Sequence, residues 1–205
     1  MRNLNVLILI FASVIVFSGC AATYMPVNPP VLNYSSHSFE DGIEFSYKYD
    51  VMMETGNKKY ARKADRKGVK LIAIKITNNS DTVINLSGNA AFYSGQDQLF
   101  PLEPIAIKGL IKQIAPAYLP YLLMSVFVLN VSNGIQTNTY PVGIALGVPI
   151  TAGNIIVAAL ANKNMLTELY AYNVLYRDIQ KGETVYGIIG IRDMEYCGIS
   201  VKLIK

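Results

Sequence analysis

Two regions of the chain show polar and apolar residues in alternation, the pattern of strands that bury one face. In the first region this pattern covers residues 42–49 (GIEFSYKY). Residues 68–77 (GVKLIAIKIT) carry apolar residues on both faces, so we expect them to form a central strand. Turn residues occupy positions 78–81, so we expect residues 82–86 to return as the hairpin partner of 68–77. A further hairpin is predicted from 90–93 and 98–102, on either side of a turn at 94–97.

The alternation resumes near the C-terminus. Residues 169–176, 184–192 and 198–204 are predicted strands, with a turn at 180–183. Short strands at this spacing, joined by Gly, Asn and Asp turns, are typical of an antiparallel β-sandwich. We therefore expect one mainly β domain of the α+β class over residues 42–205.

A long uncharged stretch separates the two β regions. Residues 113–162 contain no Asp, Glu, Lys, Arg or His. A polar loop at 132–140 divides the stretch into 114–131 and 141–161, each close to the ~20 residues that cross a hydrocarbon core. The pattern predicts an apolar helical hairpin, inserted into the β domain at about 104–164.

The second arm of this hairpin contains the spacing GxxxG at Gly143 and Gly147, which lets two helices touch backbone to backbone. We expect Gly143, Gly147 and Gly153 to form its contact face. Three alternatives stay open for the hairpin. It packs as core of the domain, it enters a membrane, or it docks on a membrane-protein partner or lines a lipid-binding cavity.

The N-terminus has the order of parts of a signal peptide. Arg2 is positive, residues 4–17 are apolar, and Ser18 and Gly19 are small residues before Cys20. The segment resembles a bacterial lipoprotein signal peptide, with Phe17 where Leu is usual. The resemblance implies that residues 1–19 are removed and that Cys20 carries a diacylglyceryl group and an acylated amine. The alternatives are an uncleaved anchor and an ordinary secretory signal.

Residues 20–41 follow as the predicted lipidated cysteine and a flexible tether, rich in Pro and Ser without apolar periodicity. Ala21 replaces the Asp that retains lipoproteins in the inner membrane of the best-known system. The resemblance thus implies an outer-membrane anchor facing the periplasm. Insertion of the hairpin would instead place the protein in the inner membrane.

The stretch VKLIAIKITNNSDTVINL, residues 69–86, resembles immunoglobulin-like extracytoplasmic domains, in which a strand ends at Asn-Asn-Ser before a hairpin. The resemblance implies an Ig-like sandwich and brings no catalytic residues with it.

Six basic residues surround Tyr60, and the net charge of +4 is too small to indicate a nucleic-acid partner. Such a cluster near a bilayer meets anionic headgroups, and the alternative is a solvated loop. The residues are Lys58, Lys59, Arg62, Lys63, Arg66 and Lys67.

The sequence offers little for catalysis. His37 is the only histidine and lies in the predicted tether, and no HExxH, CxxC, P-loop or GxSxG motif is present. If Cys20 is lipidated, as the resemblance implies, Cys197 has no partner for a disulfide, and we expect it to be buried in a strand. We therefore predict no enzyme, no cofactor and no metal.

Together these features predict a non-catalytic, membrane-anchored lipoprotein. It would act as an adaptor or accessory subunit that docks to a membrane or to a membrane-protein partner through the hairpin. The alternative is a periplasmic module that binds a lipid or another hydrophobe in a cavity lined by the hairpin.

Overall fold

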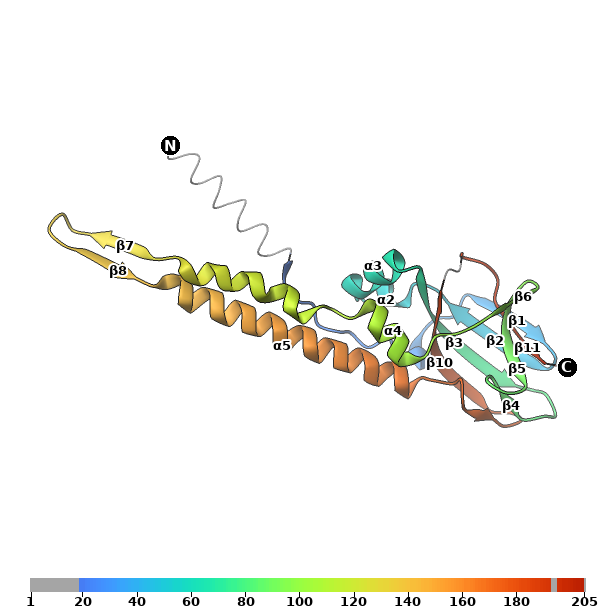
Figure 1. The fold of residues 1–205 in the computed structure, drawn as a ribbon. Coiled ribbons are helices and arrows are strands. Elements are labelled where there is room, and N and C mark those ends of the chain that lie inside the picture. Colours follow the sequence, from blue (N-terminus) through green and yellow to red (C-terminus); the bar gives the residue numbers. More distant parts are fainter. Residues whose placement is uncertain (1–18, 193–194, 205) are drawn as a thin grey trace. The chain divides into compact units, whose positions relative to one another are not determined.

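The computed structural model describes residues 19–192 and 195–204, so nearly all of the predicted signal peptide, residues 1–19, lies outside the described residues. The chain forms two compact units (Figure 1). The apolar unit contains residues 113–161 and the described residues up to Thr23. The sheet unit contains residues 24–112 and 162–205.

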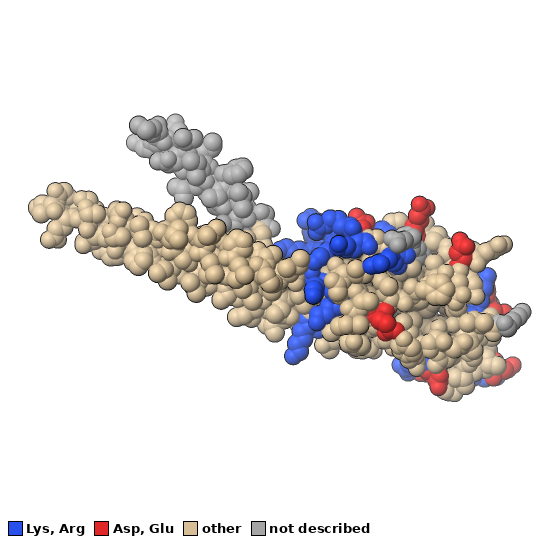
Figure 2. Space-filling model, in the orientation of Figure 1, with Lys and Arg blue, Asp and Glu red and all other residues tan. Residues whose placement is uncertain are grey.

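Among the described residues, Asp, Glu, Lys and Arg occur in only one of these units. The described residues of the apolar unit include no Asp, Glu, Lys or Arg, and this unit is uniformly tan in Figure 2. Lys112 and Lys163 stand just outside the two ends of its uncharged stretch. In the same view, Lys and Arg side chains gather on the sheet unit around α3 (Lys58–Arg66).

The sheet unit contains antiparallel sheets. The larger has the order β1-β2-β3-β10, and the next has the order β11-β5-β6, while β4 pairs with β9. The predicted strands at 42–49, 68–77 and 184–192, and the hairpin around 94–97, are confirmed. The bounds are β1 (Ser36–Glu40), β2 (Ile43–Lys48), β3 (Val69–Asn78), β4 (Ile84–Asn85), β5 (Ala90–Ser94), β6 (Asp97–Leu99), β9 (Asp178–Ile179), β10 (Thr184–Arg192) and β11 (Ser200–Leu203).

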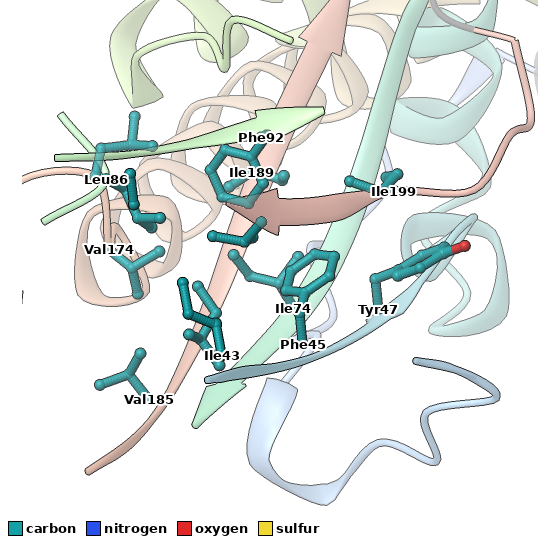
Figure 3. Packing of buried hydrophobic residues seen from close by; sticks show 14 of the residues in the cluster. Ile43, Phe45, Tyr47, Ile74, Leu86, Phe92, Val174, Val185, Ile189 and Ile199 are labelled. Atoms are coloured by element: carbon teal, nitrogen blue, oxygen red, sulfur yellow. The ribbon is translucent and has the colours of Figure 1, made fainter. Parts of the chain in front are cut away.

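The two larger sheets share one hydrophobic core. Alternate residues of β2 and β3, such as Phe45 and Ile74, meet Phe92 of β5 and Ile189 of β10 (Figure 3). The rings of Phe45 and Phe92 lie edge to face, with centroids 5.9 Å apart. The period-two pattern of the sequence therefore identified the buried face of this sheet correctly.

Two predictions of strands were wrong. Residues 82–86 do not pair with β3, because β2 and β10 already occupy both of its edges, and β4 pairs with β9 instead. Residues 169–176 are not a strand: α5 (Val142–Ala171) ends at Ala171, and Val174 and Leu175 are buried in the turn that follows. The apolar pattern at residues 169–176 therefore indicated correctly that residues are buried there, but not that they form a strand.

Short helices cover parts of the sheet unit. They are η1 (Pro29–Val31), α2 (Val51–Glu54), α3 and α4 (Pro104–Ile111). A Cβ atom on Gly190 of β10 would lie 2.8 Å from Ile107 Cδ1, so this glycine lets α4 pack closely on the strand. α4 ends at Ile111, and the first residue of the uncharged stretch, Gln113, follows after Lys112.

The segment at 21–41, expected as an extended tether, is bound to the rest of the chain. Within the sheet unit, Glu168 accepts hydrogen bonds from the Tyr24 hydroxyl (2.5 Å), the Val27 amide (3.1 Å) and the Asn28 amide (2.9 Å). Tyr24 and Val27 are buried. Residues 36–40 form the edge strand β1.

The apolar unit is a hairpin of two unlike arms (Figure 1). The second arm is the first part of α5, as predicted, but the first arm is the 3₁₀-helix η2 (Ala115–Val126). Pro120 inside η2 lacks the amide hydrogen that an α-helical turn needs. The polar loop is a two-stranded ribbon, β7 (Leu129–Ser132) and β8 (Thr137–Tyr140).

Candidate functional site

The buried face of α5 in the apolar unit consists of small and polar residues. These positions recur at intervals of three or four, so they form one stripe along the helix. A stripe of small residues lets another backbone approach closely. The residues are Gly143, Gly147, Thr151, Asn154, Ala158 and Ala161.

The close approach occurs at both glycines of the GxxxG sequence. A Cβ atom on Gly147 would lie 2.5 Å from Ser125 Oγ and 2.7 Å from Ser125 N. The Gly143 amide donates a hydrogen bond to the Phe127 carbonyl at 2.8 Å. Thus Gly143 and Gly147 face the first arm of their own hairpin, whereas a Cβ atom on Gly153 would meet no other atom within 4 Å.

Large apolar side chains point away from the hairpin on both arms. Leu123 is 70 % exposed and Val126 is 74 % exposed, and the most apolar window of α5 is only 28 % buried. Among the described residues, α5 is the one helix long and apolar enough to span a membrane. The other exposed residues on the arms are Ile114, Leu119, Leu122, Phe127, Val142, Ile144, Leu146, Val148, Ile156 and Leu160.

This distribution is the reverse of that in a helix of a water-soluble protein. Such a helix turns its large apolar residues inward and its polar residues to water. Here the hydroxyl of Thr151, on the inner stripe, donates to the Gly147 carbonyl at 2.7 Å, and the Asn154 amide donates to the Ile150 carbonyl at 2.8 Å. The donor groups of Thr151 and Asn154 are therefore satisfied within the arm, whereas the buried Ser125 Oγ of the first arm has no hydrogen-bond partner among the described residues.

Two buried amide side chains hold the backbone next to Cys20. Gln113 accepts from the Ala22 amide at 2.9 Å and donates to the Ala22 carbonyl at 2.6 Å. Asn154 accepts from the Ala21 amide at 2.5 Å. The candidate lipid attachment site, which is half-buried, is thus fixed on the apolar unit. Sequence reasoning missed Gln113 and Asn154, although they are rare polar residues within the uncharged stretch.

The six basic residues lie on or beside the helix α3 and not in a loop. Tyr60 and Ala64, four residues apart, are buried and orient the helix. The outward side carries Lys58, Arg62, Arg66 and Lys67, while Lys59 and Lys63 are half-buried.

Lys63 connects this basic helix to the end of α4. Its ammonium group donates to the carbonyl of Lys112, the last residue before the uncharged stretch. Burial lowers the pKa of Lys63, and the positive charges of Arg66, Lys67 and Lys112 lower it further. Arg66, Lys67 and Lys112 therefore place positive charge near the Lys63 ammonium group, in addition to the larger effect of burial.

The remaining candidates for chemistry lie apart. His37 is exposed on β1. Cys197 is half-buried outside the strands, which corrects its predicted location, and its sulfur accepts a hydrogen bond from Ser94 Oγ at 2.9 Å. Within the described part of the chain, no group of three or more His, Cys, Asp or Glu residues could hold a metal ion.

Comparison of the chain with protein-family models, with curated proteins and with solved structures finds no match. Its function is therefore argued from the hairpin itself.

Proposed function

We propose that the protein is a non-catalytic lipoprotein held in a bilayer at two places, by the lipid on Cys20 and by the apolar unit embedded in hydrocarbon. The reversed arrangement of the hairpin carries this proposal: small and polar residues pack inside, and large apolar residues face outward. Lipid tails cover such a surface without cost, whereas water does not.

The dimensions of both arms support the same conclusion. From Val142 to Asn162, the uncharged part of α5 covers about 30 Å at ~1.5 Å per residue. The first arm, residues 113–128, contains the 12-residue 3₁₀-helix η2, which covers about 24 Å at ~2.0 Å per residue, and two non-helical residues at each end. A typical hydrocarbon core is ~30 Å thick. The α5 arm therefore has the length of a bilayer core, and the first arm lies beside it (Figure 1).

Basic residues at the ends of the uncharged stretch also agree with a position at the membrane surface. Lys112 and Lys163 border the uncharged stretch, and Lys63 joins α3 to the carbonyl of Lys112. Anionic headgroups attract each such charge by ~1 kcal/mol. The basic helix α3 therefore serves as the headgroup contact, and the apolar arms serve as the hydrocarbon contact.

The sheet unit is then the part that the anchor holds at the membrane. Two antiparallel sheets around one core support an Ig-like sandwich, which suits an accessory subunit that presents a binding surface. Apolar helices are retained by the membrane that they enter first, which is the inner membrane for an exported protein. An anchor in the inner membrane, with the sheet unit on the periplasmic side, is therefore a better fit than an anchor in the outer membrane.

The proposal is tested with a Cys20→Ala variant behind an ordinary cleavable signal. We expect this variant to remain in membranes washed with alkaline carbonate, because the hairpin holds it without lipid. Adding Leu146→Lys and Ile156→Lys on the exposed face of α5 should release it, since a charge near the bilayer centre costs about 3 kcal/mol. The matched control adds Gln96→Lys and Lys181→Gln in the sheet unit.

Recovery of the Cys20→Ala variant in the soluble periplasm would contradict the embedded hairpin. In that event, mass spectrometry of the native protein decides between the remaining roles. A co-purified lipid would indicate a carrier of hydrophobes, and a stoichiometric protein would indicate docking on a membrane-protein partner.

The basic helix gives a separate prediction. Arg62→Gln together with Arg66→Gln should weaken binding of the Cys20→Ala chain to vesicles rich in phosphatidylglycerol by about 30-fold, or ~2 kcal/mol. Binding to zwitterionic vesicles should not change. Co-flotation at increasing salt measures both, with Lys181→Gln as the control. Equal loss on both kinds of vesicle would contradict a headgroup role.

A further inference from the structure

The tip of the apolar unit is a ribbon with open edges. Among the described strands, β7 and β8 pair only with each other, from Leu129 opposite Tyr140 to Ser132 opposite Thr137. Asn133 closes the turn by accepting hydrogen bonds from the amides of Ile135 (3.1 Å) and Gln136 (2.8 Å). Ile135 at the tip is 93 % exposed.

The ribbon has a mainly apolar face and a polar face. Successive residues of a strand point to opposite faces, and paired residues share a face. Leu129, Val131 and Tyr140 therefore lie on one face, together with Asn138, which pairs with Val131. The other face consists of Asn130, Ser132, Thr137 and Thr139, and the Thr139 hydroxyl donates to Asn130 Oδ1 at 2.7 Å.

Such a ribbon fits neither water alone nor hydrocarbon alone. Its unpaired backbone groups exclude it from the hydrocarbon core, where open sheet edges do not occur. Its strands are also far shorter than the ~10 residues with which a strand crosses a bilayer. An interface between lipid and water satisfies both faces and both edges. Because the turn contains no charge, its passage through the core needs no charged group to be desolvated.

The position of the ribbon along the hairpin identifies which interface. The α5 arm extends over about 30 Å between Lys163 and the ribbon. With Lys112 and Lys163 among the headgroups of one leaflet, the ribbon reaches the headgroups of the other. A hairpin that turned back within the core would leave the ribbon in hydrocarbon.

On the basis of the proposed function, we propose that the hairpin crosses the entire bilayer and that the β7–β8 ribbon rests in the opposite lipid–water interface. The partner of the ribbon is thus the headgroup layer of the far leaflet. Tyr140 lies at the level of the headgroups, where aromatic residues with a polar end are favoured. The face with Asn130 and Thr139 is turned to the water.

Two cysteines in one molecule test this topology. The chain with Cys20→Ala, Cys197→Ser, Gln96→Cys in the sheet unit and Ile135→Cys at the tip is reconstituted in sealed phosphatidylcholine–phosphatidylglycerol vesicles. A membrane-impermeant maleimide is added outside, and a maleimide of different mass follows after detergent. Intact-mass spectrometry then reads both labels on each molecule, whatever the mixture of orientations. The chain with Cys20→Ala and Cys197→Ser alone gives the blank.

We expect one label of each mass on nearly every molecule. Two identical labels on each molecule would place the tip and the sheet unit on the same side, and would overturn the crossing. Ile144→Cys on the exposed side of α5 distinguishes this failure from failure of the proposed function. If that cysteine is protected from the impermeant reagent, the arm lies in lipid and only the crossing is overturned. If it is labelled in vesicle-bound protein, the arm lies outside the bilayer and the proposed function is overturned as well.

Discussion

Gly143→Leu is expected to separate the two arms of the apolar unit. A Cβ atom at this position would meet the carbonyl oxygen of Met124 and lie 2.7 Å from Phe127 N, and both are backbone atoms that cannot rotate away. Overpacking of this kind costs up to about 3 kcal/mol. The hydrogen bond from the amide of residue 143 to the Phe127 carbonyl is lost as the arms part.

Hydrogen exchange in detergent micelles measures this change. Peptides that cover residues 124–128 and 142–148 should exchange about 100-fold faster in the variant, as ~3 kcal/mol of lost protection implies. Gly153→Leu is the matched control, because its side chain would enter open space on the same helix. The same acceleration in both variants would show that loss of a helix glycine, and not the close contact, is responsible.

Tyr60→Ala is expected to detach the basic helix α3 from the sheet unit. The Tyr60 side chain is fully buried, donates to Asn162 Oδ1 at 3.1 Å, and meets the ring of Tyr24 edge to face at 5.6 Å. Removal of a buried aromatic side chain costs about 3–5 kcal/mol. Urea unfolding followed by circular dichroism measures the loss, and trypsin should cut within residues 58–67 of the variant first.

Tyr60→Phe is the control for the packing of the ring. It removes only the hydroxyl and should lower the free energy of unfolding by about 1 kcal/mol. A cost for Tyr60→Phe as large as that of Tyr60→Ala would mean that the hydrogen bond to Asn162, and not the buried ring, holds the helix.

The strands that were predicted correctly are those whose pattern is local and long. β3 and β10 are rich in apolar residues over nine or more positions and are buried on both faces in their central parts, which is typical of strands inside a sheet. The predicted pairing of β4 with β3 was wrong, because strands that are neighbours in sequence need not be neighbours in a sheet. β10, which comes much later in the chain, pairs with the edge of β3 that β4 was expected to occupy. The local pattern is therefore enough to predict where most strands lie, whereas the order of strands in a sheet depends on the whole chain.

The candidate site was predicted in composition but not in geometry. The uncharged stretch, its division at a polar loop and the GxxxG sequence are visible in the residues alone. The 3₁₀ form of the first arm was missed, although Pro116 and Pro120 are an available signal. The spacing of Tyr60 and Ala64 likewise indicated that the basic cluster is a helix. No local signal connects Glu168, Gln113 or Asn154 with residues 21–28, because those bonds span most of the chain.

If Cys20 is lipidated as proposed, those long-range bonds imply an order of events in its maturation. The residues that clasp the backbone beside Cys20 follow it by 91 positions at Gln113 and by 133 at Asn154. A peptidase that cuts before Cys20 and an enzyme that acylates its thiol both need that backbone free and extended. If the protein is lipidated as proposed, cleavage and acylation therefore take place before Gln113 and Asn154 bind the backbone at Ala21 and Ala22. In the folded protein this backbone is no longer accessible to either enzyme.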